Sequence, residues 1–373
     1  MSPVIPLSEP YLGYSDRARV SKAIRSGWLT QAGKEVKIME ESLVNFYGFK
    51  TTSKYSVTST SNGTTALHLA LLAINVKAGD EVIIPNFAYV AVANAVLYVG
   101  AIPVVVDVDI DTWNISTDQI LSKINAKTKA VIIVDNYGRL NDYSKLRKIV
   151  PAQIKIIQDA AESFPGNVHK QFVKNYGDIV TISFYANKII TAGEGGAIIA
   201  PKDMIEKIKY LKNQAQIPGS NFNHGDIGFN YRISNVHAAI FNAQWNKLKK
   251  NEKKRQKIFE KYYIALKKEN IIFSTNDHEN SAKWLFTIKI ENLKIPMLKI
   301  RNSLASRGIE SRPGFTPFSK MLYLKKASIL DKNYPNSDVL ANSVISLPTY
   351  PGLKSNQIDF IVASLGEIIF NEK

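Results

Sequence analysis

Residues 181–197 read TISFYANKIITAGEGGA, and the interpretation of the whole chain starts from this stretch. It begins with alternating apolar and polar residues, which is typical of a strand. Lys188 follows, and a glycine-rich turn then leads into the apolar residues 197–200. A lysine between two buried strands loses its proton easily, because burial disfavours the ammonium form. Such an amine can form an imine with a carbonyl compound. Taken alone, a lysine in a hairpin turn is the more frequent explanation.

Length and composition are those of an ordinary two-domain protein. The chain has 373 residues, of which 45% are hydrophobic and 21% charged, and it contains no cysteine. Two domains of usual size fit this length, and disulfide and thiolate chemistry are excluded. The first residues do not resemble a signal peptide, and Gly100 and Pro103 divide the longest apolar run, residues 87–106. We therefore expect a cytoplasmic protein without membrane contacts. Separately, we predict no metal site.

The net charge of +16 raises the possibility of a nucleic-acid partner. Much of the excess lies in residues 246–257, where lysines recur along one amphipathic stretch. Charge arranged in this way is more often a solvated helix face than a binding site. No nucleic-acid-binding motif accompanies it, so we expect no such partner. A basic surface can instead attract anionic substrates.

Strands alternate with helices through the first part of the chain. The patterns predict strands at 55–60, 81–85, 102–106, 130–134 and 154–158, and helices at 66–72, 88–99, 117–124 and 143–149. This order is typical of an α/β fold with a mostly parallel sheet covered by helices. A strand at 284–290 and helices at 297–307 and 355–370 predict a smaller α+β domain. The predicted domains are 1–250 and 251–373.

Three features lie where such sheets bind ligands, at the carboxyl ends of strands. Residues 61–65 form a small-residue turn before a helix, which is a weak anion-site signal. Asp159 follows a strand and is either a helix cap or the partner of a cation. Tyr89 could offer a ring face to a planar ligand or be a core aromatic. Together with Lys188 they match what pyridoxal phosphate needs, namely an anion site, a carboxylate for the ring nitrogen and an amine for the aldehyde.

At this level of detail the sequence resembles the DegT/StrS-type sugar-nucleotide aminotransferases, which belong to the aspartate aminotransferase-like fold type I. The resemblance covers nearly the whole chain and rests on six blocks in the family order. The blocks are residues 27–30 (GWLT), 61–71 (SNGTTALHLAL), 159–162 (DAAE), 183–196 (SFYANKIITAGEGG), 228–232 (GFNYR) and 308–313 (GIESRP).

The resemblance implies a role for each matched residue. Lys188 would bond covalently to pyridoxal phosphate and move the proton, Asp159 would pair with the pyridinium nitrogen, and Glu162 would lie near the 3-hydroxyl. The remaining cofactor contacts would be made to the phosphate by Gly63, Thr64 and Ser183, and to the ring face by Tyr89.

The family pattern also implies a homodimer with shared active sites, because Asn230 matches a residue that reaches the phosphate of the neighbouring subunit's cofactor. Trp28, Asn187 and Arg312 are the matched positions that we expect to contact substrate.

The implied reaction moves an amino group from L-glutamate to C4 of a dTDP- or GDP-linked 4-keto-6-deoxyhexose. It belongs to amino-sugar biosynthesis for glycans such as the lipopolysaccharide O-antigen. The chain is similar in kind to perosamine and viosamine synthases. It departs from the perosamine type at residues 135–138 and 315–319, where histidine-containing segments are usual, and both segments are expected to flank the sugar.

Three alternatives remain beside this reaction. Relatives that aminate C3 tend to carry a proline shortly before the lysine, and 3-dehydratases on the same scaffold replace the lysine with histidine. A sensor that keeps the fold without catalysis would be expected to lose Lys188 or Asp159. Both residues are present, which favours an aminotransferase.

Overall fold

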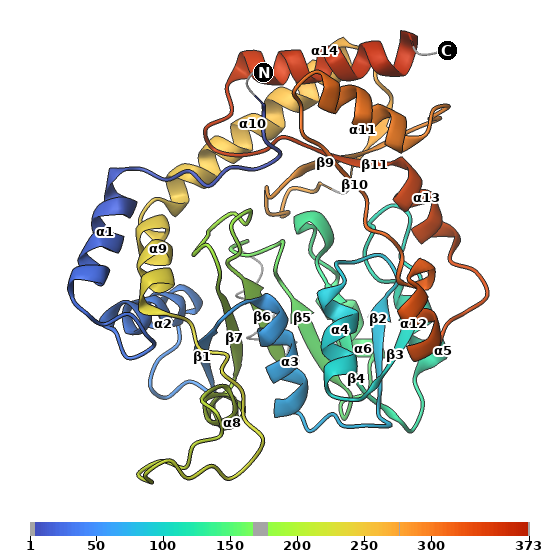
Figure 1. The fold of residues 1–373 in the computed structure, drawn as a ribbon. Helices are drawn as coiled ribbons and strands as arrows, with labels where there is room; N and C mark the ends of the chain where they lie inside the picture. Colours follow the sequence, from blue (N-terminus) through green and yellow to red (C-terminus); the bar gives the residue numbers. More distant parts are fainter. Residues whose placement is uncertain (1–3, 167–177, 276, 372–373) are drawn as a thin grey trace.

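The computed structural model describes residues 4–166, 178–275 and 277–371, and it contains two sheets joined by a long helix (Figure 1). The larger sheet has the strand order β1-β7-β6-β5-β4-β2-β3. Its strands are β1 (Tyr55–Thr60), β2 (Glu81–Pro85), β3 (Ile102–Val106), β4 (Thr128–Val134), β5 (Lys155–Asp159), β6 (Ile179–Ser183) and β7 (Gly196–Pro201). Neighbouring strands from β6 to β3 are parallel, and only β7 runs against its two neighbours. The predicted mostly parallel sheet is confirmed.

Helices cover both faces of this sheet (Figure 1). They are α1 (Tyr14–Arg25), α2 (Lys34–Tyr47), α3 (Gly63–Ala73), α4 (Ala91–Tyr98), α5 (Thr117–Lys123), α6 (Tyr143–Ile149), α8 (Lys202–Lys212) and α9 (Asn235–Trp245). Along β4, Val131 and Ile133 pack with α2, α6 and α9, whereas Ala130 and Ile132 pack with α3, α4 and α8. Because successive side chains point to opposite covered faces, the central strands are apolar throughout.

The smaller unit is built on an antiparallel sheet with the order β10-β11-β9-β8. Its elements are α10 (Leu248–Lys268), β8 (Phe273–Ser274), β9 (Phe286–Ile290), α11 (Met297–Ser306), β10 (Arg312–Pro313), η2 (Phe318–Lys320), α12 (Leu322–Ala327), α13 (Pro335–Ser343), β11 (Val344–Leu347) and α14 (Ser355–Asn371). A separate apolar core joins α10, α11 and α14 to β9. The predicted α+β character of this unit is confirmed.

Two details concern the junction between the units. The predicted boundary at residue 250 falls inside α10, and the division into residues 1–250 and 251–373 stays a prediction. Ile5 pairs with Ile309, so the chain near its N-terminus packs on the smaller unit.

The charge and apolar patterns have simple structural outcomes. The lysine-rich segment begins α10, where Lys249, Lys250 and Lys253 are exposed, as expected for a solvated helix face. The apolar run at 87–106 contains α4 and β3. Within the residues that the structure describes, no helix combines the length and the apolar character needed to cross a membrane.

Candidate active site

The candidate active site lies at the carboxyl ends of three adjacent parallel strands. β4 is followed by the short helix η1 (Asn136–Gly138), β5 ends at Asp159 and β6 ends at Ser183. Because β4, β5 and β6 are neighbours in the sheet, these three segments meet at one edge. Lys188 lies in the turn that leads from β6 back to the antiparallel strand β7.

The side chain of Lys188 is largely enclosed, with 14% of its surface exposed. Its Nζ lies 3.9 Å from Oε1 of Glu162 and 4.0 Å from the ring centre of Trp284. Burial lowers the pKa of Lys188 below its usual value, Glu162 and Asp159 act against this, and Arg312 adds to it. The amine therefore reaches its nucleophilic form at lower pH than a surface lysine does.

Asp159 is the last residue of β5 and is buried. Its Oδ1 accepts a hydrogen bond from the backbone N–H of Ala161 at 3.0 Å. Burial raises the pKa of Asp159 to about 6, while this hydrogen bond and the charge of Lys188 lower it. The carboxyl group thus braces the turn after β5 and also lies within the electrostatic reach of the lysine.

Glu162 connects the lysine to the turn after β4. Its Oε2 accepts a hydrogen bond from the backbone N–H of Tyr137 at 2.7 Å, while Oε1 faces Lys188. Burial raises the pKa of Glu162 to about 7, although Lys188 and the Tyr137 N–H lower it. Near neutral pH this carboxyl group can therefore hold or release a proton beside the amine.

The predicted anion site is formed by the start of α3 and the end of β6. Asn62 caps the helix, because its side chain accepts a hydrogen bond from the backbone N–H of Thr65 at 2.9 Å. A Cβ atom placed on Gly63 would lie 2.9 Å from Cβ of Ser183, so these two residues lie side by side. Thr64 follows in the first helical turn. Unpaired N–H groups at a helix start attract anions, and glycine leaves room for close approach.

Two predicted cofactor residues lie at the surface of the single chain. Tyr89, between β2 and α4, is 63% exposed, so it is not a core aromatic and its ring is accessible to a ligand. Asn230 is also exposed, and its Oδ1 accepts hydrogen bonds from Nε and Nη2 of Arg232 at 3.1 and 2.7 Å. Stacking by Tyr89 and the reach of Asn230 into a second subunit stay predictions.

The predicted substrate residues separate into two places. Asn187 and Arg312 line one pocket of about 470 Å³, which Tyr185 and Arg301 also line. Within the described chain, Oδ1 of Asn187 is buried and has no hydrogen-bond partner. Trp28 lies outside the lining of this pocket, in the loop between α1 and α2, where 60% of its surface is exposed.

Sequence patterns alone did not identify the aromatic residues around the lysine. Trp284 belongs to the smaller unit, and only the tertiary fold brings it to Lys188. Tyr137 lies in the segment that departs from the perosamine type, and its ring stacks on Phe315 at a centroid distance of 5.0 Å. The two segments that depart from the perosamine type, residues 135–138 and 315–319, are therefore in contact. Their separation in the sequence gave no sign of this contact.

The residues present fit pyridoxal phosphate. The start of α3 offers an anion cradle that a Cβ on Gly63 would fill, and Asp159 and Lys188 supply the carboxylate and the amine at the adjoining strand ends. Among the described residues, no group of three or more His, Asp or Glu side chains is arranged to hold a metal ion.

Relatives at the level of sequence are sugar-nucleotide enzymes. The chain is 33% identical over 371 residues to GDP-perosamine synthase of Escherichia coli O157:H7, with 97% of this chain and 98% of the relative covered. It is 34% identical over 361 residues to GDP-perosamine synthase of Vibrio cholerae, with 95% and 96% covered.

Solved structures show the same fold with the cofactor in place. The protein Spr1654 of Streptococcus pneumoniae, assigned as a sugar aminotransferase and solved in its PMP form, superposes with a TM-score of 0.91 at 24% identity, covering 99% of this chain and 98% of that chain. Its PLP form superposes with a TM-score of 0.89. The model of the DegT/DnrJ/EryC1/StrS aminotransferase family matches residues 10–366. The chain therefore belongs to this family of pyridoxal-phosphate-dependent sugar aminotransferases.

Proposed function

We propose that the protein transfers the amino group of L-glutamate to C4 of a GDP-linked 4-keto-6-deoxyhexose. The observation that carries this proposal is the enclosed amine of Lys188, 3.9 Å from Glu162 at the strand ends. The choice of sugar and nucleotide is supported by the two GDP-perosamine synthases named above, at 33% and 34% identity. The dTDP-linked sugar is the alternative that the experiment below includes.

When bound, pyridoxal phosphate supplies an aldehyde and an electron-withdrawing ring. We place its ring nitrogen at the carboxylate of Asp159, its 3-hydroxyl near Glu162 and its aldehyde at Lys188. The phosphate and ring-face contacts are assigned to Gly63, Thr64, Ser183 and Tyr89, with Asn230 contributed by a second subunit.

Lys188 has two roles in this proposal. Its Nζ would hold the cofactor at the aldehyde carbon, and the free amine would carry a proton between substrate atoms. Enclosure favours the first role, because it lowers the pKa of the amine. The neighbouring Glu162, whose pKa is raised to about 7, can itself hold or release a proton near neutral pH beside the amine.

In this proposal an aromatic wall, which reaches the lysine through Trp284, limits the access of water to these proton movements. Tyr137 stacks on Phe315 at 5.0 Å and lies parallel to Trp284 at 6.3 Å. We place the hexose against this wall, because the wall contains both segments that differ from the perosamine type. Its particular shape would select among 4-keto-6-deoxyhexoses.

The pocket lined by Asn187, Arg301 and Arg312 is our candidate binding site for the charged part of a substrate. Two guanidinium groups attract a carboxylate or a diphosphate. Nε of Arg301 and Oδ1 of Asn187 are buried and have no hydrogen-bond partner in the described part of the chain. A ligand that accepts from Arg301 and donates to Asn187, as an amino acid can, would satisfy both.

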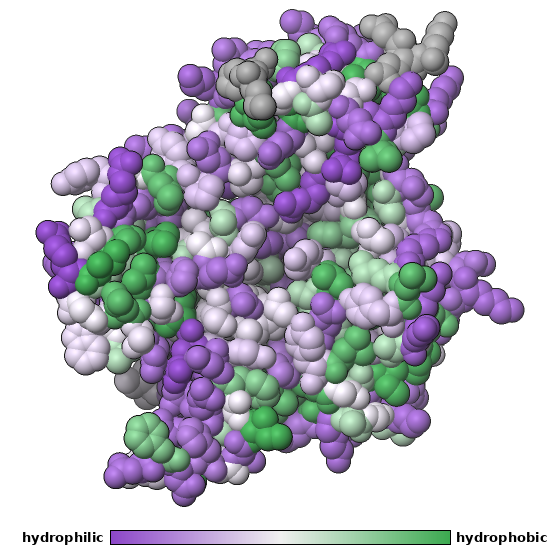
Figure 2. Space-filling model, viewed as in Figure 1, coloured by the Kyte–Doolittle hydropathy of each residue, from purple (hydrophilic) through white to green (hydrophobic). Residues whose placement is uncertain are grey.

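A homodimer is part of the proposal. The loop that carries Asn230 projects from the body beyond α8 (Figure 1), and on it Phe222 and Ile227 are 89% and 86% exposed. Figure 2 shows a further apolar patch over α1, where Ile24 is 53% exposed. A second copy of the chain would cover such surfaces. We place this dimer in the cytoplasm, in amino-sugar synthesis for surface glycans such as the O-antigen.

The test is an assay of the purified protein with glutamate and either GDP- or dTDP-linked 4-keto-6-deoxyhexose. Mass spectrometry identifies an amino sugar, and NMR locates the nitrogen. An amine at C4 of the GDP-linked sugar is expected. An amine at C3, or a product that has lost its 3-hydroxyl without gaining nitrogen, would refute the proposal in favour of one of the two alternative reactions.

A further inference from the structure

The amine of Lys188 lies close to two groups that favour a positive charge. The ring centre of Trp284 lies 4.0 Å from Nζ, and Oε1 of Glu162 lies 3.9 Å from it. A cation within about 6 Å of an indole face is attracted to it, and the attraction is strongest in enclosed sites. Trp284 is 2% exposed and the side chain of Lys188 14%, so the contact is largely shielded from bulk water.

Two contacts orient the indole, and a third anchors the backbone of Trp284. Nε1–H of Trp284 donates to the carbonyl oxygen of Asn187 at 2.9 Å, directly before the lysine in sequence. The carbonyl oxygen of Trp284 accepts a hydrogen bond from Nη1 of the buried Arg255 at 2.6 Å. Tyr137 lies parallel to the indole, with an interplanar angle of 23°. The ring therefore has little freedom to leave the lysine.

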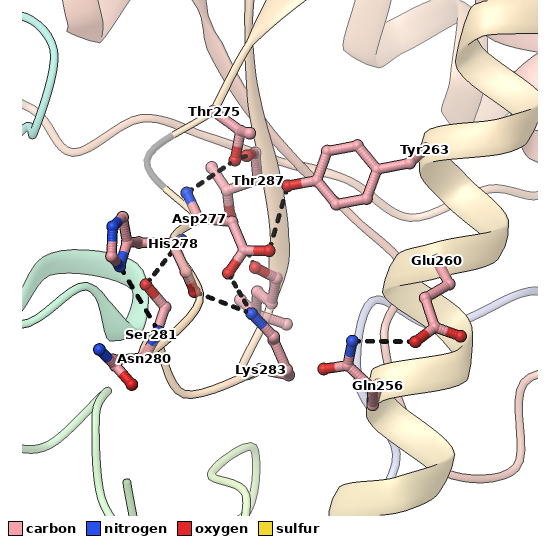
Figure 3. Close-up of polar contacts among 11 residues, drawn as sticks. Gln256, Glu260, Tyr263, Thr275, Asp277, His278, Asn280, Ser281, Lys283 and Thr287 are labelled. Carbon is pink, nitrogen blue, oxygen red and sulfur yellow. Dashed lines mark hydrogen bonds and ion pairs between the residues drawn. The ribbon is translucent and has the colours of Figure 1, made fainter. Parts of the chain in front are cut away.

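The loop before Trp284 is braced from α10 and from the turn after β4. Asp277 accepts hydrogen bonds from Nζ of Lys283 at 2.6 Å and from the Tyr263 hydroxyl at 3.1 Å (Figure 3). Lys283 also donates to the carbonyl oxygen of His278 at 3.1 Å. The N–H of Ala282 donates to the carbonyl oxygen of Gly138 at 2.9 Å. This network holds the indole of the smaller unit against a lysine of the larger one.

We propose that Trp284 is a positioning residue for Lys188, and that its ring face forms the rest position of the amine, as an ammonium, whenever the amine is not covalently bonded. This inference rests on the proposed function, in which Lys188 alternates between a bonded and a free state. The other charged groups that act on the amine are Glu162 and Asp159, which favour the ammonium, and Arg312, which opposes it.

The test measures how fast the amine of Lys188 reacts with trinitrobenzenesulfonate in the full-length, cofactor-free protein, from neutral to alkaline pH. Peptide mass spectrometry quantifies the label at Lys188. Only the unprotonated amine reacts, so the pH profile reports its pKa. Trp284→Leu should move the midpoint to lower pH, so that the rate at a pH below the midpoint rises about 2- to 30-fold. Trp284→Phe keeps a ring face and should restore most of the wild-type profile.

Controls separate this effect from a loosened structure. An opening of the site would raise the rate at alkaline pH as well, whereas loss of the ring face moves only the midpoint. Lys212 is a buried internal reference, because its amine donates to Oγ1 of Thr58 at 2.7 Å, and its labelling should not change. Trp245→Leu removes a tryptophan that packs on Phe164 and Phe241 and should leave the Lys188 profile unchanged.

An unchanged midpoint in folded Trp284→Leu would overturn the inference. If that variant does not fold, Trp284→Met fills the space without a ring and is judged by the same criterion. The measurement uses neither sugar nor amino donor, so its failure is distinct from a failure of the proposed reaction.

Discussion

Burial acts in opposite directions on the charged residues of the site. It lowers the pKa of Lys188 and raises the pKa of Asp159 to about 6 and of Glu162 to about 7. The pKa values of the acids and of the amine are thus moved toward each other, which makes proton transfer between them less unfavourable. The sequence singled out all three residues as candidates, but the 3.9 Å between Lys188 and Glu162 and the contact of Lys188 with Trp284 arise only from the tertiary fold.

We expect Lys188→Ala to lower the transamination rate to less than a tenth of the wild-type rate, because the nucleophile and proton carrier are lost together. Thermal unfolding should show that the variant still folds. Lys209→Ala is the matched control, since that lysine lies on α8 with 44% of its side chain exposed and should retain full activity. Turnover above a tenth of the wild-type rate in Lys188→Ala would contradict the assignment.

We expect Asp159→Asn to stabilise the cofactor-free protein more at pH 8 than at pH 5. The folded-state pKa of about 6 lies above the ordinary 3.8, so the folded protein binds more protons than the unfolded chain in this window. The contribution of Asp159 to the free energy of unfolding therefore falls as the pH rises through this folded-state pKa. The gain in the free energy of unfolding should grow by about 1 kcal/mol between the two pH values. Urea denaturation measures it, and a difference independent of pH would contradict the expectation.

At the scale of elements, the position of the start of α3 depends on β7, the strand that follows the turn carrying Lys188. A Cβ on Gly196, the first residue of β7, would lie 2.5 Å from the carbonyl oxygen of Asn62 and 2.6 Å from Oγ1 of Thr60. Asn62 is the cap of α3, so the glycine lets β7 pack directly beneath the predicted phosphate site.

We expect Gly196→Ala to displace Asn62, to destabilise the protein by about 1–3 kcal/mol and to weaken the binding of pyridoxal phosphate. Gly352→Ala is the control, because the nearest atoms to its Cβ would lie at an ordinary 3.6 Å. Thermal unfolding and a cofactor titration would check both variants. Equal cofactor affinity in Gly196→Ala and wild type would show that the cap does not position the site.

The sequence predicted the strands of the larger sheet well and the short elements of the smaller unit poorly. β1, β2 and β3 have the predicted bounds, because each is an apolar or β-branched run between turn residues. Four elements of the smaller unit, β8, α12, α13 and β11, were not predicted. β8 has two residues, and its pairing of Phe273 with Ile290 depends on its partner strand β9. Such pieces are ordered by tertiary contacts rather than by a local pattern.

The whole molecule combines a site that is assembled within one chain with surfaces that suggest a second chain. Lys188, Asp159 and Glu162 come together without a partner, whereas Asn230 lies on a projecting loop beside exposed apolar residues. If the proposed dimer is correct, each active site contains Lys188 of one subunit and Asn230 of the other. This arrangement can be tested by combining two different inactive variants.

Lys188→Ala removes the amine from its own subunit's site, and Asn230→Asp places a negative charge beside the phosphate of the neighbouring site. We expect each homodimer to have little activity. After the variants are unfolded and refolded together in equal amounts, half of the dimers are hybrids, and each hybrid has one site with both native residues. The mixture should recover about a quarter of wild-type activity. If each active site were built from one chain alone, every site in the mixture would lack one of the two native residues. A mixture no more active than its parents would therefore show that Asn230 does not serve the neighbouring site.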